Sequence, residues 1–254
     1  MEDRQLIGGG LRAAILALAL AAGIGGLAFV LLRDGDSSEL EIPPVTSERL
    51  QSALGATTQP FAPDRACDVY VVPVDGSSEG SAARLARALP LRVPVRACTT
   101  SSFRLDLSAL DSGREQLDAV VVSDQLARAF QDAKGITPAT ILGVTAFDIY
   151  SSAFAGDPFD FGVAKKFPQK QGFAVVSTAR MGSGEELFEG LETMAMRYLG
   201  LLHFGLSESA SPGSALSPSI RSLEDLDLLE PRFSDPQPSS EVLRAARREF
   251  LAQE

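Results

Sequence analysis

The chain has 254 residues, of which 45% are hydrophobic and 22% are charged. This composition is typical of a folded protein with one or two domains and excludes a wholly disordered chain. Asp and Glu outnumber Lys and Arg by 33 to 23, and the net charge of −10 disfavours binding to the phosphate backbone of nucleic acid. One histidine and two cysteines are too few for a zinc site built from several such side chains.

The first apolar segment is predicted to cross a membrane. Residues 13–32 carry no charge, and at about 1.5 Å per residue a helix of this length spans the roughly 30 Å hydrocarbon layer. A cleaved signal peptide has an apolar stretch of only about 7–15 residues, so we favour an uncleaved signal anchor over a cleaved leader. Arg4 and Arg12 precede the span and only Arg33 follows it closely. This bias predicts a cytoplasmic N terminus at 1–12 and an extracytoplasmic domain, on the periplasmic side if the source is bacterial.

A linker and one globular domain are expected after this segment. Residues 33–66 are rich in Asp, Ser, Pro and Thr, as is typical of a linker, and include one expected short helix at 47–54. The next segments predict a βαβ unit made of the strand 68–74, the helix 80–89 and the strand 91–95. The elements expected after it are a long helix at 112–133 and strands at 140–145 and 174–177. Together they predict an α/β or α+β domain with a mixed sheet.

Two further helices are predicted in the C-terminal half. The stronger one is Glu185–Leu202, where apolar residues recur every three or four positions and would bury one stripe against the sheet, with Gly205 as a stop. The other begins at Ser239 or Ser240 as N-cap and runs to the C terminus, with Val242, Ala246 and Phe250 on one side. This last helix either packs on the domain or stays loose.

Several short motifs, taken in order, resemble conserved segments of the archaemetzincins, a family of zinc peptidase-like proteins with the pattern HExxHxxGxxH. The matching segments are Arg114 with Gln116, Ile141–Thr145 with Asp148–Tyr150, Phe161–Ala164, Val175–Ser177 with Arg180, Gly200–His203 and Ser222–Asp227. The resemblance implies a zincin-like α/β (α+β) domain at 67–237, with a mixed sheet and an active-site-type helix. In this family the segment at Phe161–Ala164 is an edge strand, and residues 238–254 would form a separate C-terminal helix.

The family's metal-binding pattern is largely missing. With His203 aligned as the third histidine, the first histidine falls on Thr193, the catalytic glutamate on Met194 and the second histidine on Arg197, so only Gly200 and His203 match. Two histidines one helical turn apart are needed to hold zinc, and a carboxylate is needed to take a proton from its water. Neither requirement is met, so no catalytic residue is expected.

The cysteine ligands of the family are missing as well. Their positions correspond to Ser214, Ser234 and Gln237. A zinc site that combines His203 with Asp225 or Asp227 is an alternative, but an ordinary hydrogen-bonded histidine is favoured. We therefore expect no metal and no other cofactor.

Arg197 is the most informative of these substitutions. Thr193 and Arg197 are four residues apart, on the helix face that the resemblance directs into the substrate cleft. A guanidinium there either binds an acidic ligand or pairs with a carboxylate from 222–227 and fills the pocket, and we favour the second interpretation.

The function predicted from these features is a membrane-anchored, extracytoplasmic pseudo-metallopeptidase that binds or scaffolds a peptide or protein without catalysis. The expected ligand-binding residues are Phe161, Gly162, Arg197 and His203, with β-strand addition as the expected mode. The alternative is an archaemetzincin-type zinc metallopeptidase with a non-standard site. A serine hydrolase that uses His203 has no supporting G-x-S-x-G motif.

The two cysteines raise the question of whether the domain contains a disulfide. An exported domain with two cysteines favours a disulfide. Cys67, however, precedes the first predicted strand and Cys98 follows the second. If those strands are parallel neighbours, a rise of about 3.3 Å per residue separates the cysteines by more than the roughly 7 Å between Cα atoms that a disulfide tolerates. The sequence thus predicts two unbridged thiols.

Overall fold

The computed structural model describes residues 67–74, 78–131, 138–153, 159–166, 171–218 and 220–253. The predicted N-terminal segment 1–12, the membrane span 13–32 and the linker 33–66 with its short helix lie outside the described residues. Among the helices that are described, none has the length and apolar character needed to cross a membrane.

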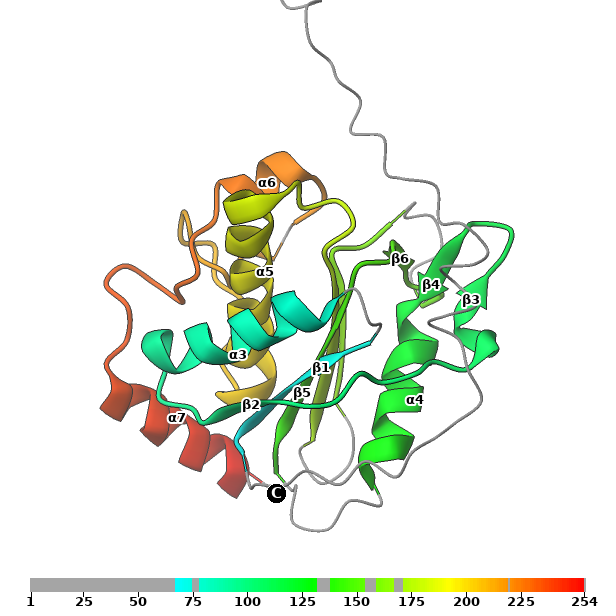
Figure 1. The fold of residues 1–254 in the computed structure, drawn as a ribbon. Coiled ribbons are helices and arrows are strands. Elements are labelled where there is room, and N and C mark those ends of the chain that lie inside the picture. Colours follow the sequence, from blue (N-terminus) through cyan, green and yellow to red (C-terminus); the bar gives the residue numbers. More distant parts are fainter. Residues whose placement is uncertain are drawn as a thin grey trace, which may run out of the picture. The chain divides into compact units, whose positions relative to one another are not determined.

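The main sheet has five strands in the order β2-β1-β5-β8-β7. Their bounds are β1 Val69–Pro73, β2 Ala97–Thr99, β5 Thr140–Thr145, β7 Gly162–Lys166 and β8 Gly172–Ser177. The strands β2, β1, β5 and β8 are parallel, whereas β7 is antiparallel to β8. Every residue of β1, β5 and β8 is buried because helices cover both faces of the sheet (Figure 1). The predicted mixed sheet is confirmed, and so is the edge position of the strand that begins beside Phe161.

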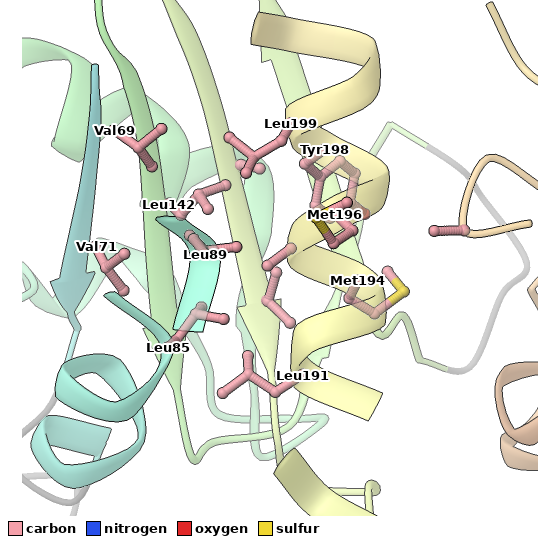
Figure 2. Packing of buried hydrophobic residues seen from close by; sticks show 14 of the residues in the cluster. Val69, Val71, Leu85, Leu89, Leu142, Leu191, Met194, Met196, Tyr198 and Leu199 are labelled. Carbon is pink, nitrogen blue, oxygen red and sulfur yellow. The ribbon is translucent and has the colours of Figure 1, made fainter. Parts of the chain in front are cut away.

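Helices α3 (Glu79–Arg92) and α5 (Gly184–Tyr198) lie on one face of the sheet, and α4 (Ala119–Gln131) lies on the other (Figure 1). In α3 the apolar residues Leu85 and Leu89 are one helical turn apart, and both are fully buried. Figure 2 shows them packed with Leu142 of β5 and with Leu191 of α5 in one core cluster. The helix α5 is thereby fixed on the central strands.

A second, small sheet replaces the beginning of the predicted helix 112–133. Its strands, in the order β3-β4-β6, are β3 Leu110–Asp111, β4 Gln116–Asp118 and β6 Ile149–Tyr150, and a 3-10 turn at Leu107–Ala109 precedes it. The Asp111 carboxylate accepts hydrogen bonds from the main-chain N–H groups of Gly113 and Arg114, at 2.9 and 3.1 Å, and holds the hairpin turn. This local bond competes with helix formation, so the helix begins only at Ala119.

The predicted strand 91–95 is also wrong. The prediction that Cys67 and Cys98 form no disulfide depended on it. The helix α3 continues to Arg92, and the second strand is β2, in which Cys98 pairs in register with Tyr70. Cys67 lies only three residues before Tyr70, so the two Cα atoms are 6.1 Å apart and the cysteines form a disulfide. The expectation of two unbridged thiols is therefore incorrect.

The C-terminal region has two helices, α6 (Leu223–Asp227) and α7 (Ser240–Ala252). The predicted N-cap of α7 is confirmed, because the Ser239 hydroxyl accepts a hydrogen bond from the Val242 N–H at 3.3 Å. The helix packs on the domain, the first of the two alternatives, through buried Leu243 and through Phe250, which lies against Gly205, whereas Val242 is 57% exposed. Of the three residues expected on one side of α7, Ala246 and Phe250 are thus partly buried, and Val242 is exposed.

Candidate functional site

The helix α5 leads into a π-helical turn at Leu199–His203. The Phe204 N–H donates to the Leu199 carbonyl at 3.0 Å, and the Leu206 N–H donates to the Gly200 carbonyl at 2.8 Å. Gly205 ends the helix with a φ of +67°, a conformation that glycine adopts without steric cost. The predicted helix at Glu185–Leu202 and its stop at Gly205 are confirmed, with the π-helical turn as an addition.

The face of α5 that the resemblance directs into a cleft is covered by the C-terminal segment. Thr193 and Met194 are only 2% and 3% exposed. In Figure 2, Met194 points away from the sheet, and it belongs to the same apolar cluster as Leu216 and Phe233. A Cβ atom on Gly200 would lie 2.5 Å from Leu216, which shows how closely this segment approaches the helix. At the first histidine position and the catalytic glutamate position, the chain therefore has packed side chains.

Arg197, at the second histidine position, binds the covering segment. Its Nη1 donates a hydrogen bond to the Ser217 carbonyl, and its Nη2 donates to Glu208 Oε1 at 2.7 Å. The Arg197 side chain is 12% exposed and that of Glu208 is 50% exposed. The expected partner in 222–227 is wrong, because the carboxylate that binds Arg197 belongs to Glu208. Asp225 instead closes a capping box with Ser222 at the beginning of α6.

His203 lies away from Arg197, at the amino end of β5. Its Nδ1 is 3.2 Å from the Thr140 hydroxyl, and its ring packs edge-on against Phe204. Burial, assisted by the nearby Arg247 guanidinium, lowers the pKa of His203 to about 3, so the ring is neutral at physiological pH. His203 contacts Thr140, Phe204 and Arg247. Arg197 instead contacts Ser217 and Glu208, so these two predicted site residues do not act on a common partner.

The predicted binding edge at Phe161 and Gly162 is present, but its side chains are part of the core. Phe161 is buried and packs edge-to-face on Phe159 with ring centroids 5.4 Å apart. A Cβ atom on Gly162 would lie 2.7 Å from the Tyr198 ring, so only glycine leaves room for this tyrosine of α5. Burial raises the pKa of Tyr198 well above its usual value. What this edge offers a ligand is therefore backbone.

Along β7, the main-chain N–H and C=O groups of successive residues point alternately toward β8 and away from it. The Ser177 N–H donates to the Phe161 carbonyl at 3.0 Å, and the antiparallel register then directs Val163 and Lys165 toward β8. The N–H and C=O groups of Gly162, Ala164 and Lys166 consequently point away from β8. Within the part of the chain that the structure describes, no strand pairs with β7 on that outer side.

A polar cluster that the sequence did not predict lies between the two sheets. Gln116 Nε2 donates to Asp148 Oδ2 at 2.8 Å, and Arg180 donates to both oxygens of Asp148 at 2.9 and 2.6 Å. The Arg180 guanidinium also lies 4.1 Å from the centre of the Phe159 ring. Gln116, Asp148 and Arg180 were each part of the resemblance, but no pattern in the sequence indicated that they touch. Gln116 lies on β4 and not on the long helix where it was expected.

The side chains at the family's cysteine positions make hydrogen bonds in this chain. The Ser214 hydroxyl donates to the Phe233 carbonyl at 2.7 Å, and the Phe233 N–H donates to the Gln237 side chain, also at 2.7 Å. The Ser234 hydroxyl donates to the Pro236 carbonyl at 2.8 Å. The bond from Ser214 to Phe233 joins the two segments, and the other two bonds stabilise the local fold of residues 233–237.

No protein-family model and no curated protein matches the sequence. Solved structures do match. An archaemetzincin from Methanopyrus kandleri has a TM-score of 0.54 and 21% sequence identity, and the match covers 77% of this chain and 98% of that one. The chain has an archaemetzincin-like fold. An archaemetzincin from Archaeoglobus fulgidus, complexed with malonate, matches with a TM-score of 0.52 at 21% identity, over 70% of this chain and 98% of that one. A zinc-dependent peptidase from Methanocorpusculum labreanum matches with a TM-score of 0.55 at 22% identity, over the same shares of the two chains.

The archaemetzincin-like fold raises the question of whether these residues fit a zinc ion. Arg197 has only hydrogen-bond donors, Met194 has no carboxylate, and the His203 ring is directed to Thr140. Among the described residues, no three His, Cys, Asp or Glu side chains form a group that could hold a metal ion. The residues at the family's motif positions in this archaemetzincin-like domain do not fit zinc.

Proposed function

We propose that this chain is a membrane-anchored, extracytoplasmic and non-catalytic relative of zinc metallopeptidases, whose archaemetzincin-like domain binds an extended peptide or protein segment. The observation that carries the proposal is the outer backbone of β7, where Gly162, Ala164 and Lys166 direct N–H and C=O groups away from the sheet. An exposed sheet edge of this kind accepts an added strand through main-chain hydrogen bonds.

The side chains on α5 support a non-catalytic role. The position of the family's catalytic glutamate has Met194, which cannot take a proton from water. The guanidinium of Arg197 stands where a zinc ligand would, and its positive charge opposes a metal cation there. Elemental analysis of the purified protein is expected to find far less than one zinc per chain. Stoichiometric zinc together with chelator-sensitive peptide hydrolysis would support the alternative, a zinc metallopeptidase with a non-standard site.

The disulfide between Cys67 and Cys98 supports the extracytoplasmic location. Structural disulfides persist in oxidising compartments and are rare in the cytosol. A signal anchor at 13–32 with a cytoplasmic N terminus places the domain in such a compartment. Protease added to intact spheroplasts is expected to digest the domain. Its survival there would contradict the proposed topology.

One substitution tests strand addition at β7. Ala164 is exposed and its N–H points outward, so Ala164→Pro removes a hydrogen bond to an added strand and leaves the bonds to β8 intact. We expect this variant to lose binding to a library of extended peptides, whereas Ala164→Val, which keeps the N–H, binds as the original chain does. Equal binding by the two variants would contradict the proposal.

A further inference from the structure

We infer that Arg197 is a carboxylate-binding residue whose site is filled, in the free protein, by the chain's own Glu208, and that a ligand with a free C-terminal carboxylate displaces Glu208. The inference rests on the proposed binding of extended peptides at β7 and names the group that the site recognises at the end of such a peptide.

The guanidinium of Arg197 is a nearly buried charge in a fixed position. Its side chain is 12% exposed, and the hydrogen bond to the Ser217 carbonyl holds one end of the group. A buried positive charge needs a negative partner, because the interior solvates it poorly. Among the residues that the structure describes, Glu208 supplies the one carboxylate in contact with Arg197.

The pair is less complete than comparable pairs in the same domain. Arg92 binds both oxygens of Glu192, at 3.0 and 3.1 Å, and Arg180 binds both oxygens of Asp148. Arg197 donates a single hydrogen bond to Glu208. A guanidinium has five N–H donors in a fork that matches the two oxygens of a carboxylate. Ser217 and Glu208 accept from two of these donors, so a ligand carboxylate that engages the guanidinium with both oxygens would make one more hydrogen bond to Arg197 than Glu208 does.

Glu208 is placed so that its side chain can leave without unfolding the segment. On one side of it the Leu206 N–H donates to the Gly200 carbonyl at 2.8 Å, and on the other side the Ser209 N–H donates to the Leu216 carbonyl at 2.9 Å. These bonds fix the backbone, while the Glu208 side chain is 50% exposed. A single-bonded ion pair with a half-exposed partner is weak in water, so displacement costs little.

The site also lies beside the proposed binding edge. Tyr198, the residue after Arg197, packs against Gly162 at the beginning of β7. Successive residues of a helix are about 100° apart around its axis, so Arg197 occupies the neighbouring sector of α5. For a peptide that adds antiparallel to β7, the inference directs the C-terminal carboxylate to the Gly162 end of the strand, toward the sector of α5 that contains Arg197.

The test uses the full-length protein and a library of extended hexapeptides in two forms, with a free C-terminal carboxylate and with a C-terminal amide. We expect the carboxylate form to bind at least about tenfold more tightly, because a hydrogen bond to a charged group is lost in the amide. Arg197→Gln is expected to abolish this preference. Glu208→Gln is expected to tighten binding of the carboxylate form by about two- to fivefold. Glu230→Gln, the control, removes a similarly exposed carboxylate that makes one bond to Arg232 and is expected to change nothing.

A small probe separates this inference from the proposed strand addition. N-acetylalanine has one carboxylate and too little backbone to form a strand, and it is expected to raise the melting temperature of the Glu208→Gln variant more than N-acetylalanine amide does. Peptides that bind equally as acid and amide, yet are lost in Ala164→Pro, would overturn the carboxylate site and leave strand addition standing. A response to N-acetylalanine without any peptide binding at β7 would support the carboxylate site and contradict strand addition. No difference between acid and amide for either probe overturns the inference.

Discussion

Arg247 on α7 donates a hydrogen bond of 2.6 Å from Nη1 to the main-chain carbonyl of His203, at the end of the π-helical turn. Its Nη2 donates a second bond, of 2.5 Å, to the Pro138 carbonyl, shortly before β5. Burial lowers the pKa of Arg247 to about 10, so the guanidinium stays charged at neutral pH. One side chain of the C-terminal helix therefore ties the end of the α5 segment to the entry of a central strand.

The first prediction follows from these two bonds. Replacing Arg247 by Met leaves the carbonyls of His203 and Pro138 without this donor, and we expect the free energy of unfolding to fall by about 1–3 kcal/mol. Urea unfolding followed by circular dichroism measures this. Arg248→Met, at an exposed neighbouring position, is the control and is expected to change stability by less than about 0.5 kcal/mol. Equal stability of the two variants would contradict the contact.

The second prediction concerns the close approach of α5 to the edge strand. In Gly162→Ala the added methyl would lie 2.7 Å from Tyr198 and 2.9 Å from the Val175 carbonyl, so we expect a loss of about 1–3 kcal/mol. Gly80 in α3 has no heavy atom within 4 Å of its added Cβ. Gly80→Ala is therefore expected to be neutral or to stabilise by about 0.4–1 kcal/mol, measured in the same unfolding experiment. A tolerated alanine at position 162 would show that Tyr198 is placed differently.

The third prediction is that the disulfide contributes substantially to stability. Cys67 and Cys98 are 31 residues apart, and closing a loop of that length in the unfolded chain corresponds to roughly 3–4 kcal/mol. Reduction with dithiothreitol is expected to lower the melting temperature of the original protein. The double variant Cys67→Ser with Cys98→Ser should start at the lower value and not respond to the reductant. A reductant-insensitive original protein would mean that the bond is absent.

The fourth prediction is a pH dependence that comes from His203. Its pKa is lowered to about 3 in the folded state, from an ordinary value near 6.5, mainly by burial and further by Arg247, while Asp68 opposes the shift. The unfolded chain therefore binds a proton at higher pH than the folded chain. The stability contribution is complete above about pH 6.5 and is lost as the pH falls toward 3, by at most about 1.4 kcal/mol per pH unit.

His203→Asn keeps a polar group near Thr140 and cannot be protonated in this range. Its unfolding free energy should fall less steeply between pH 6.5 and 4.5 than that of the original chain. Because both proteins share all carboxylates, the difference between the two slopes isolates the histidine. Identical slopes would mean that His203 is solvated in the folded protein.

The elements predicted well from the sequence are those in which burial determines the spacing of the apolar residues. The strand 140–145 and the helix at Glu185–Leu202 have apolar runs that fit one structure only, and the structure has both. The segment 112–118 was mistaken for helix because Leu117 and the valines after it happen to lie at helical spacing. The sequence Asp111-Ser112-Gly113 is the available signal for a turn, since an aspartate side chain readily accepts hydrogen bonds from the N–H groups two and three residues after it.

The candidate site could be predicted only in part, for a geometric reason. The positions Thr193, Met194 and Arg197 follow from counting along one helix, and the structure does place them on the face that meets the C-terminal segment. The pairing of Arg197 with Glu208 depends on the path of the chain through the π-helical turn and the left-handed Gly205. Neither feature produces a periodic spacing of apolar residues, so the sequence pattern does not predict it.

The lysines of β7 have a consequence for self-association. An open sheet edge is a place where identical chains can stack on one another. Lys165 is paired with Asp124, and exposed Lys166 lies 5.0 Å from the centre of the Phe250 ring. A parallel, in-register stack of β7 strands would bring each Lys166 directly opposite its copy, and like charges in that position repel. The charge of Lys166 therefore disfavours fibril-like stacking of this edge between identical chains, whereas a strand without a positive charge at that position meets no such repulsion.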